Sequence, residues 1–143
     1  MNKLTIYLLW AARIVAALIL LQTLYFKFGG VAESVYIFST LGVEPWGRIG
    51  SGVVELIASI LILIPRTSWI GAGIGLGVMT GAILSHLTIL GVEVLGDGGY
   101  LFFLAVVVAV SCSLILWITR AEWIPVLQNV VARLTGKKPA FVS

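Results

Sequence analysis

The feature that most constrains the fold of this chain is a set of four long apolar stretches that occupy most of its length. They cover about residues 4–26, 46–64, 68–90 and 100–119. A helix needs roughly 20 residues to cross the hydrocarbon core of a bilayer, where every backbone polar group must be satisfied internally. Only 10% of the 143 residues are charged, whereas a soluble domain carries roughly a quarter. We therefore expect an all-α integral membrane four-helix bundle that forms a single transmembrane domain over residues 1–143.

The basic residues predict how the bundle is oriented. Cytoplasmic loops of membrane proteins carry an excess of Lys and Arg. If the N-terminus is cytoplasmic, the inner side holds Lys3, Arg66, Arg120, Arg133, Lys137 and Lys138, and the outer side holds only Lys27 and Arg48. This asymmetry predicts a multi-pass protein of the cell (inner) membrane with both termini in the cytoplasm (N-in/C-in). Because membrane topology accounts for the clustering of the basic residues, no nucleic-acid partner is expected.

Two further helices are expected outside the spanning stretches. In the first outer loop, Ala32 to Leu41 mixes apolar and polar residues and predicts a short helix on the outer interface. After the fourth stretch, the cytoplasmic tail of about residues 121–143 begins with the amphipathic segment Glu122 to Leu134, which is expected to lie on the inner membrane surface. The remainder, Thr135 to Ser143, is expected to be disordered.

Ionisable groups inside the apolar stretches are the candidates for a functional site, because such groups are costly in a bilayer and are usually paired or functional. Arg13 and Lys27 are 14 residues apart, close to four helical turns, and so share a face of the first helix. In the second stretch, polar residues recur at helical spacing and predict a stripe that faces the bundle interior. The predicted ligand-binding or intramembrane polar cluster comprises Arg13, Lys27, Arg48, Ser51, Glu55 and His86. The same pattern also fits an ion pair that only holds the helices together.

Counting residues from the helix ends, here called depth counting, predicts that Arg13 and Glu55 lie at the same depth in the membrane. Each lies about nine residues from one end of its helix, which places both roughly 13 Å deep at 1.5 Å per residue. Consecutive antiparallel helices are usually neighbours. We therefore expect an Arg13–Glu55 ion pair near the middle of the membrane.

Small residues in the third stretch predict a close helix contact. Gly73, Gly77, Gly81 and Ser85 are each four residues apart, and small residues at this spacing let two helix backbones approach. The partner helix can belong to the same chain or to a second subunit of a homo-oligomer.

The single histidine and the single cysteine limit the chemistry. With only His86, the chain provides neither intrachain bis-histidine haem ligation nor a metal site with several histidines. His86 is either a hydrogen-bonding or proton-handling residue near a bound ligand or a structural histidine. Cys112 has no partner for a disulfide and is expected to be a small buried packing residue. No nucleotide-binding, metalloprotease or nucleophile motif indicates a self-contained catalytic centre.

Taken together, the motifs resemble the DoxX family of small four-helix membrane proteins between about Arg13 and Trp117. The matching positions are Arg13 and Lys27 followed by Phe28, Gly29 and Gly30; Leu41, Gly42 and Pro45; Glu55 and Arg66; Met79, Gly81, Ala82 and His86; and Asp97, Gly98 and Gly99. The chain lacks the paired cysteines of the thiol-active members, so the resemblance does not extend to disulfide exchange.

The resemblance implies a membrane subunit of an oxidoreductase system. Such a subunit would hold a quinone or another lipid-soluble ligand among its helices and work with a soluble or membrane redox partner. Two alternatives stand beside it: a non-catalytic interaction or assembly protein, and a small oligomeric transporter. Small multidrug transporters also have four helices, but they place an essential glutamate in the first helix, where this chain has Arg13.

Overall fold

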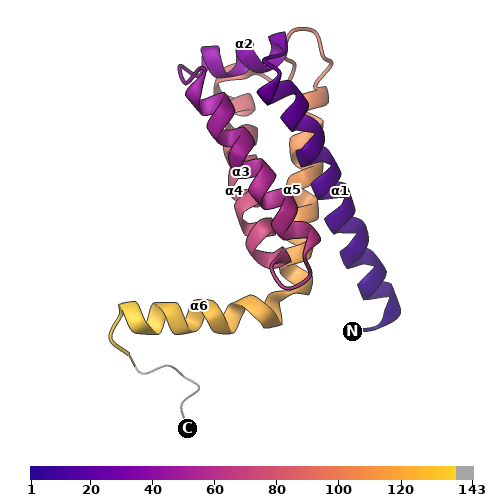
Figure 1. Cartoon of the computed structure of the whole chain (residues 1–143), viewed down its shortest axis with the longest axis vertical. Coiled ribbons are helices and arrows are strands. Elements are labelled where there is room, and N and C mark those ends of the chain that lie inside the picture. Colours follow the sequence, from indigo (N-terminus) through magenta and orange to yellow (C-terminus); the bar gives the residue numbers. More distant parts are fainter. Residues whose placement is uncertain (138–143) are drawn as a thin grey trace.

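The computed structural model describes residues 1–137, which form an all-helical structure (Figure 1). Its elements are α1 (Lys3–Phe28), α2 (Ala32–Thr40), α3 (Trp46–Leu63), α4 (Ser68–Ser85), the π-helical η1 (His86–Leu90), α5 (Tyr100–Ile118) and α6 (Arg120–Leu134). The helix α1, the helix α3, the continuous run of α4 and η1, and the helix α5 are long and apolar enough to cross a membrane. This supports the expected multi-pass helical bundle. Residues 138–143, which make up most of the tail expected to be disordered, lie outside the described residues.

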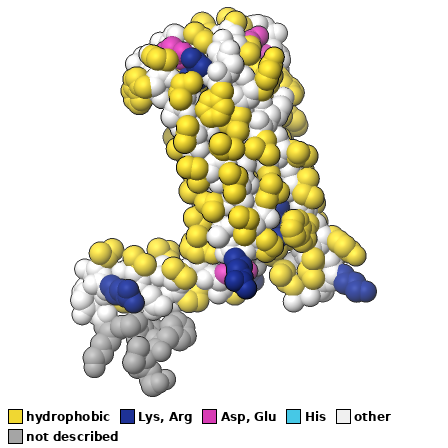
Figure 2. All heavy atoms as spheres, viewed as in Figure 1, with side chains coloured by type: hydrophobic (Ala, Val, Ile, Leu, Met, Phe, Trp, Pro, Cys, Tyr) yellow, Lys and Arg dark blue, Asp and Glu magenta, His cyan; other side chains and the backbone are white. Residues whose placement is uncertain are grey.

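The four long helices form an antiparallel bundle in which α1 and α4 each pack against both α3 and α5. The core between them is apolar and tightly closed, since the side chains of Leu20, Ile62, Val108 and Ile115 are fully buried. Apolar side chains also cover the outside of the bundle, while most charged side chains gather toward its two ends (Figure 2). An apolar exterior of this kind suits contact with lipid tails.

Two short helices lie across opposite ends of the bundle (Figure 1). The nine-residue α2 covers the end at which α1 finishes, here called the α2 end. The 15-residue α6 turns away from α5 at the opposite end, called the α6 end, and buries none of its residues. The indole Nε1 of Trp123 donates a hydrogen bond of 2.8 Å to the carbonyl oxygen of Leu116, which ties the start of α6 to α5.

Helix lengths determine which residues lie at the same level. The helix α1 has 26 residues and α3 has 18, so α1 extends beyond α3 at the α6 end (Figure 1). Arg13 therefore lies level with the turn between α3 and α4, and the Cα atoms of Arg13 and Lys27 are separated by roughly 21 Å along the helix.

The glycine stripe predicted for α4 does not make the contact expected of it within this chain. A Cβ atom added to Gly73, Gly77 or Gly81 would meet nothing within 4 Å in the described residues. The close approach occurs at Gly71 instead, where an added Cβ would lie 2.6 Å from the backbone nitrogen of Ile62. Gly71 and Gly75 are also four residues apart, so spacing alone does not distinguish them from the predicted stripe. Only the rotation of α4 in the bundle decides which set of glycines faces the neighbouring helices. Gly81 and Ser85 of the predicted stripe line a cavity inside the bundle, and contact of Gly73 and Gly77 on the outer face with a second subunit stays a prediction.

Candidate functional site

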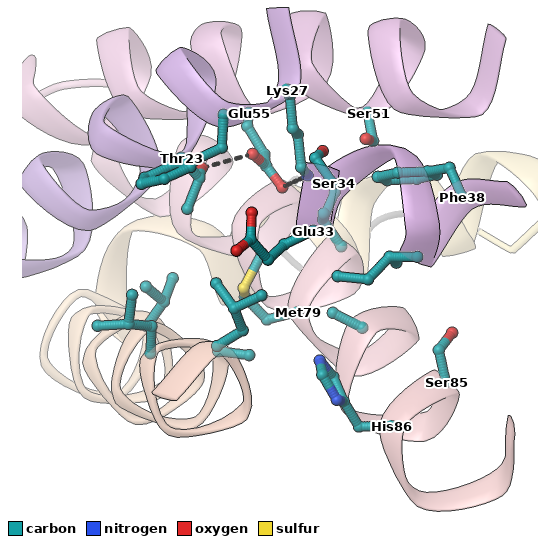
Figure 3. A pocket seen from close by; sticks show the side chains of 18 of the residues that line it. Thr23, Lys27, Glu33, Ser34, Phe38, Ser51, Glu55, Met79, Ser85 and His86 are labelled. Carbon is teal, nitrogen blue, oxygen red and sulfur yellow. Dashed lines mark hydrogen bonds and ion pairs between the residues drawn. The ribbon is translucent and has the colours of Figure 1, made fainter. Parts of the chain in front are cut away.

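A cavity of about 580 Å³ lies at the α2 end of the bundle. Its walls come from α1, α3, α4 and α5, and α2 covers it (Figure 3). Most of the lining is apolar, including Phe26, Phe38 and Leu104. Polar side chains reach it from several helices, so the cavity combines an apolar body with a few convergent polar groups, as ligand sites usually do.

An ion pair between Lys27 and Glu55 forms part of the cavity wall (Figure 3). The Lys27 Nζ atom lies 2.5 Å from Oε1 of Glu55, whose side chain is 1% exposed. The Thr23 hydroxyl donates to the other oxygen of this carboxylate at 2.9 Å. Lys27 Nζ also lies 5.5 Å from the ring centroid of Phe38, which α2 supplies. The carboxylate of α3 is thus held by two side chains of α1 that are one helical turn apart.

Arg48 does not line the cavity but contacts residues beside it. Its guanidinium is in contact with Glu44, at 2.8 Å between Nη2 and Oε1, and donates to the backbone carbonyl oxygen of Lys27. This contact ties the start of α3 to the end of α1 beside the ion pair. Ser51, one turn further along α3, does line the cavity, and its hydroxyl donates to the carbonyl oxygen of Arg48 at 3.1 Å.

The predicted Arg13–Glu55 ion pair is wrong. Arg13 donates to the Ser68 hydroxyl at 2.9 Å and to the carbonyl oxygen of Pro65 at 3.4 Å, both at the α6 end. Its guanidinium also stacks over the Trp10 ring at 4.9 Å from the centroid. Depth counting failed because it placed the ends of α1 and α3 at the same two membrane levels, whereas α1 extends beyond α3 at the α6 end and places Arg13 level with the turn between α3 and α4. Arg13 therefore does not belong to the site.

His86 lies at the start of the π-helical turn, a local distortion that is frequent at functional sites. Its Nδ1 atom is 2.8 Å from the carbonyl oxygen of Gly91. Because a carbonyl only accepts, Nδ1 carries the proton in this contact. The ring packs edge-on against Phe102, with centroids 5.6 Å apart. The imidazole lines the cavity on the side of Met79 (Figure 3), and its Nε2 atom has no hydrogen-bond partner among the described residues.

The loop beside His86 is held by one carboxylate. Asp97 accepts hydrogen bonds from the backbone N–H groups of Val94, Gly99 and Leu101 at 3.0, 2.8 and 3.1 Å. Burial works to raise the pKa of Asp97, but these three hydrogen bonds and the nearby His86 together hold that pKa below its ordinary value. The loop before α5 is therefore ordered around an ionised carboxylate at the rim of the cavity.

The structure brings Lys27, Ser51, Glu55 and His86 of the predicted polar cluster to one cavity, with Arg48 next to it. Sequence reasoning missed Thr23, Glu33 and Ser34, which also line the cavity. Thr23 was detectable, since it precedes Lys27 by one helical turn on the same face. Glu33 and Ser34 were not, because the pattern of α2 predicts an interfacial helix and does not say what it covers.

The other side chains that could react or bind a metal do not add to the site. Cys112 is fully buried in the core, as expected for a packing residue. Within residues 1–137 there is no group of three or more His, Cys, Asp or Glu side chains that could hold a metal ion. The polar side chains that line the cavity can exchange hydrogen bonds with a bound molecule.

No protein-family model, no curated protein and no solved structure matches this chain.

Proposed function

We propose that this protein binds a lipid-soluble small molecule in the cavity at the α2 end and serves as a DoxX-like membrane subunit of an oxidoreductase system. The observation that carries the proposal is the cavity itself: about 580 Å³ of largely apolar space with Lys27, Glu55 and His86 on its walls. Cavities of roughly 300–1,000 Å³ are typical of small-molecule sites. The volume suits the ring and first tail atoms of a quinone or a molecule of similar size.

The ion pair supports a binding role. A charge placed alone in the bilayer core costs roughly 2.5–3.5 kcal/mol on insertion scales, and Glu55 is held in place by both Lys27 and Thr23. Polar groups fixed in this way can orient a ligand that enters from the lipid without reorganising around it. The oxidoreductase role and a redox partner rest on the resemblance to the DoxX family.

The proposal includes an orientation. We place the α6 end on the cytoplasmic side of the inner membrane, because the start of α1, the turn between α3 and α4, and α6 all lie toward that end (Figure 1). These segments and the residues just after α6 carry five basic residues of the described range, Lys3, Arg66, Arg120, Arg133 and Lys137. The cavity then lies in the outer leaflet, with α2 on the outer interface. On α6, large apolar side chains recur at helical spacing and are exposed, among them Val126, Leu127, Val130 and Val131. This face would lie in the inner membrane surface.

One observation favours a second candidate, a non-catalytic interaction or assembly protein. Gly73 and Gly77, the outward part of the predicted stripe of α4, have open space around them and leave a helix surface that another membrane helix can approach closely. In that case the protein would hold a partner or a second copy of itself through α4, and the cavity would be secondary.

Occupation of the cavity is the test of the proposal. Protein purified in mild detergent should carry a lipid-soluble molecule, detectable in the absorbance spectrum and in a solvent extract analysed by mass spectrometry. Ala82 lines the cavity, so Ala82→Phe places a bulky ring there and should prevent this molecule from binding. Ala11→Phe is the matched control, because Ala11 is exposed on α1 and does not line the cavity. The proposal fails if no such molecule is found, or if both variants retain it equally.

A further inference from the structure

The polar groups of the cavity divide into those that already have partners and those that do not. Lys27 and Glu55 neutralise each other at 2.5 Å. The Thr23 hydroxyl donates its proton to the carboxylate of Glu55 or to the carbonyl oxygen of Leu20, and the Ser51 hydroxyl donates to the carbonyl oxygen of Arg48. These two hydroxyl donors and one N–H of the Lys27 ammonium are therefore used within the protein.

Two acceptors of the cavity are without a partner in the described residues. The Glu33 carboxylate projects into the cavity between Glu55 and Met79 (Figure 3), and it has no ion-pair or hydrogen-bond partner among residues 1–137. The Nε2 atom of His86 can also accept, because Nδ1 carries the proton in its contact with the carbonyl oxygen of Gly91. Ser34 is buried against the same space and its hydroxyl can serve in either role.

The balance of charge points the same way. The lining contains three carboxylates, Glu33, Glu55 and Asp97, and one ammonium group, that of Lys27. Since Glu55 is paired with Lys27 and Asp97 is bonded to its own loop, Glu33 is the uncompensated charge. A carboxylate that loses water on ligand binding must receive hydrogen bonds in exchange, or binding is opposed by its desolvation.

We infer that the cavity takes an amphiphile whose head group donates hydrogen bonds, either a protonated amine or paired hydroxyls, in preference to a head group that only accepts. The inference rests on the proposed function and names the ligand class of the same cavity. Glu33 and His86 would receive the donated hydrogen bonds. The aromatic walls at Phe26, Phe38 and Tyr100 accommodate a ring and also favour a cation. For a quinone-linked system, this chemistry selects the hydroquinone, which has two O–H donors, over the quinone, whose carbonyls only accept.

Two matched probe pairs test the inference on the whole protein in lipid nanodiscs. The first pair is a short-tailed benzohydroquinone and its quinone, compared under anaerobic conditions. The second is dodecylamine and dodecanoate, which share a tail and carry opposite charges. Equilibrium binding and the thermal shift are measured for all four. We expect the donor member of at least one pair to bind about tenfold more tightly than its counterpart, the effect of a charged hydrogen bond. A preference in the first pair alone identifies hydroxyl donors, and one in the second alone identifies an amine.

Variants assign the effect to the carboxylate. Glu33→Gln keeps the shape of the side chain but removes its charge and turns one acceptor into a donor, so it should abolish the preference for the donor probe. Glu93→Gln is the matched control, because Glu93 is exposed in the loop before α5 and does not line the cavity. Equal or tighter binding of the quinone and of dodecanoate would overturn the inference, and so would a preference that survives Glu33→Gln.

The same experiment separates this inference from the proposed function. Probes that bind and are blocked by Ala82→Phe, but show no donor preference, would refute the ligand class and leave the binding function standing. If none of the four probes binds, or if Ala82→Phe does not reduce binding, the proposed function fails together with the inference.

Discussion

At the scale of single residues, the buried charged side chains Glu55 and Arg13 each have a hydrogen-bond partner at their own depth. Glu55 is held by Lys27 and Thr23 at the α2 end. Arg13, also buried, is held by the Ser68 hydroxyl at the α6 end. Because an isolated charge in a bilayer costs several kcal/mol, such local pairing is what makes these residues tolerable inside apolar helices.

The Lys27–Glu55 ion pair predicts energetic coupling. Lys27→Met and Glu55→Gln should each lower the melting temperature in detergent, because each leaves a buried partner unsatisfied. The double variant should be less damaged than the sum of the two, with a coupling energy of roughly 0.5–3 kcal/mol. Thermal or denaturant unfolding measures all four proteins of the cycle.

Arg13→Met combined with Glu55→Gln is the control cycle, and its effects should add. The two residues bind to different partners at opposite ends of the bundle, and distant sites are usually independent. Additive effects of Lys27 and Glu55, or coupling between Arg13 and Glu55, would contradict the arrangement described here.

At the scale of helices, α4 presents small residues on two faces with different roles. Gly71 lies against the backbone of α3, and an added Cβ would be 2.7 Å from the carbonyl oxygen of Ala58. Gly75 lies against α5, where an added Cβ would be 3.1 Å from Sγ of Cys112. Gly77 has open space around it. Gly71 and Gly75 therefore let α4 pack closely against α3 and α5. This tight packing between the cavity and the α6 end fixes the positions of the cavity walls.

This difference predicts the response to substitution in α4. Gly71→Ala should lower stability by about 1–3 kcal/mol, since a core that is already packed must shift to accept a methyl group. Gly77→Leu should be tolerated, although its side chain is much larger, because an added Cβ atom at Gly77 has open space around it in the described residues. Unfolding of the monomeric protein in detergent compares the two.

Size-exclusion chromatography with light scattering completes the comparison. If Gly77→Leu leaves the monomer stable but breaks a dimer, the outward stripe is a contact between subunits. If Gly77→Leu destabilises the monomer more than Gly71→Ala does, the rotation of α4 in the structure is incorrect.

At the scale of the whole molecule, the two ends of the bundle differ in what they carry. The α2 end holds the cavity, the Lys27–Glu55 pair and the ordered loop around Asp97. The α6 end holds most of the basic side chains and a helix whose apolar face is exposed. A bilayer with a cytoplasmic side that prefers Lys and Arg should therefore accept this protein in one orientation.

The orientation is tested by reporter fusions. A reporter placed after Ser143 should be active only in the cytoplasm, and one inserted between Gly96 and Asp97 should be active only on the outer side. The second fusion needs flexible linkers, because Asp97 organises its loop. Activity of the first fusion on the outer side of the membrane would reverse the proposed orientation, and the cavity would then lie in the inner leaflet.

The sequence by itself determined the number and length of the long helices. The expected stretches differ from α1, α3, the α4–η1 run and α5 by no more than two residues at any end, because the thickness of the bilayer sets how many apolar residues a span needs. It also identified Lys27, Glu55 and His86 as candidates, because an ionisable group within such a span stands out on chemistry alone.

Only the tertiary structure decided which of these residues meet. Helical periodicity places residues on one face of their own helix, but the offset between two helices and the rotation of each come from side-chain packing. Because of the offset between α1 and α3, Glu55 pairs with Lys27, and Arg13 instead donates a hydrogen bond to Ser68. The fold of α2 across the bundle brought Glu33 over the cavity. Neither the offset nor the fold of α2 leaves a local pattern in the sequence, since both depend on how distant segments fill space together.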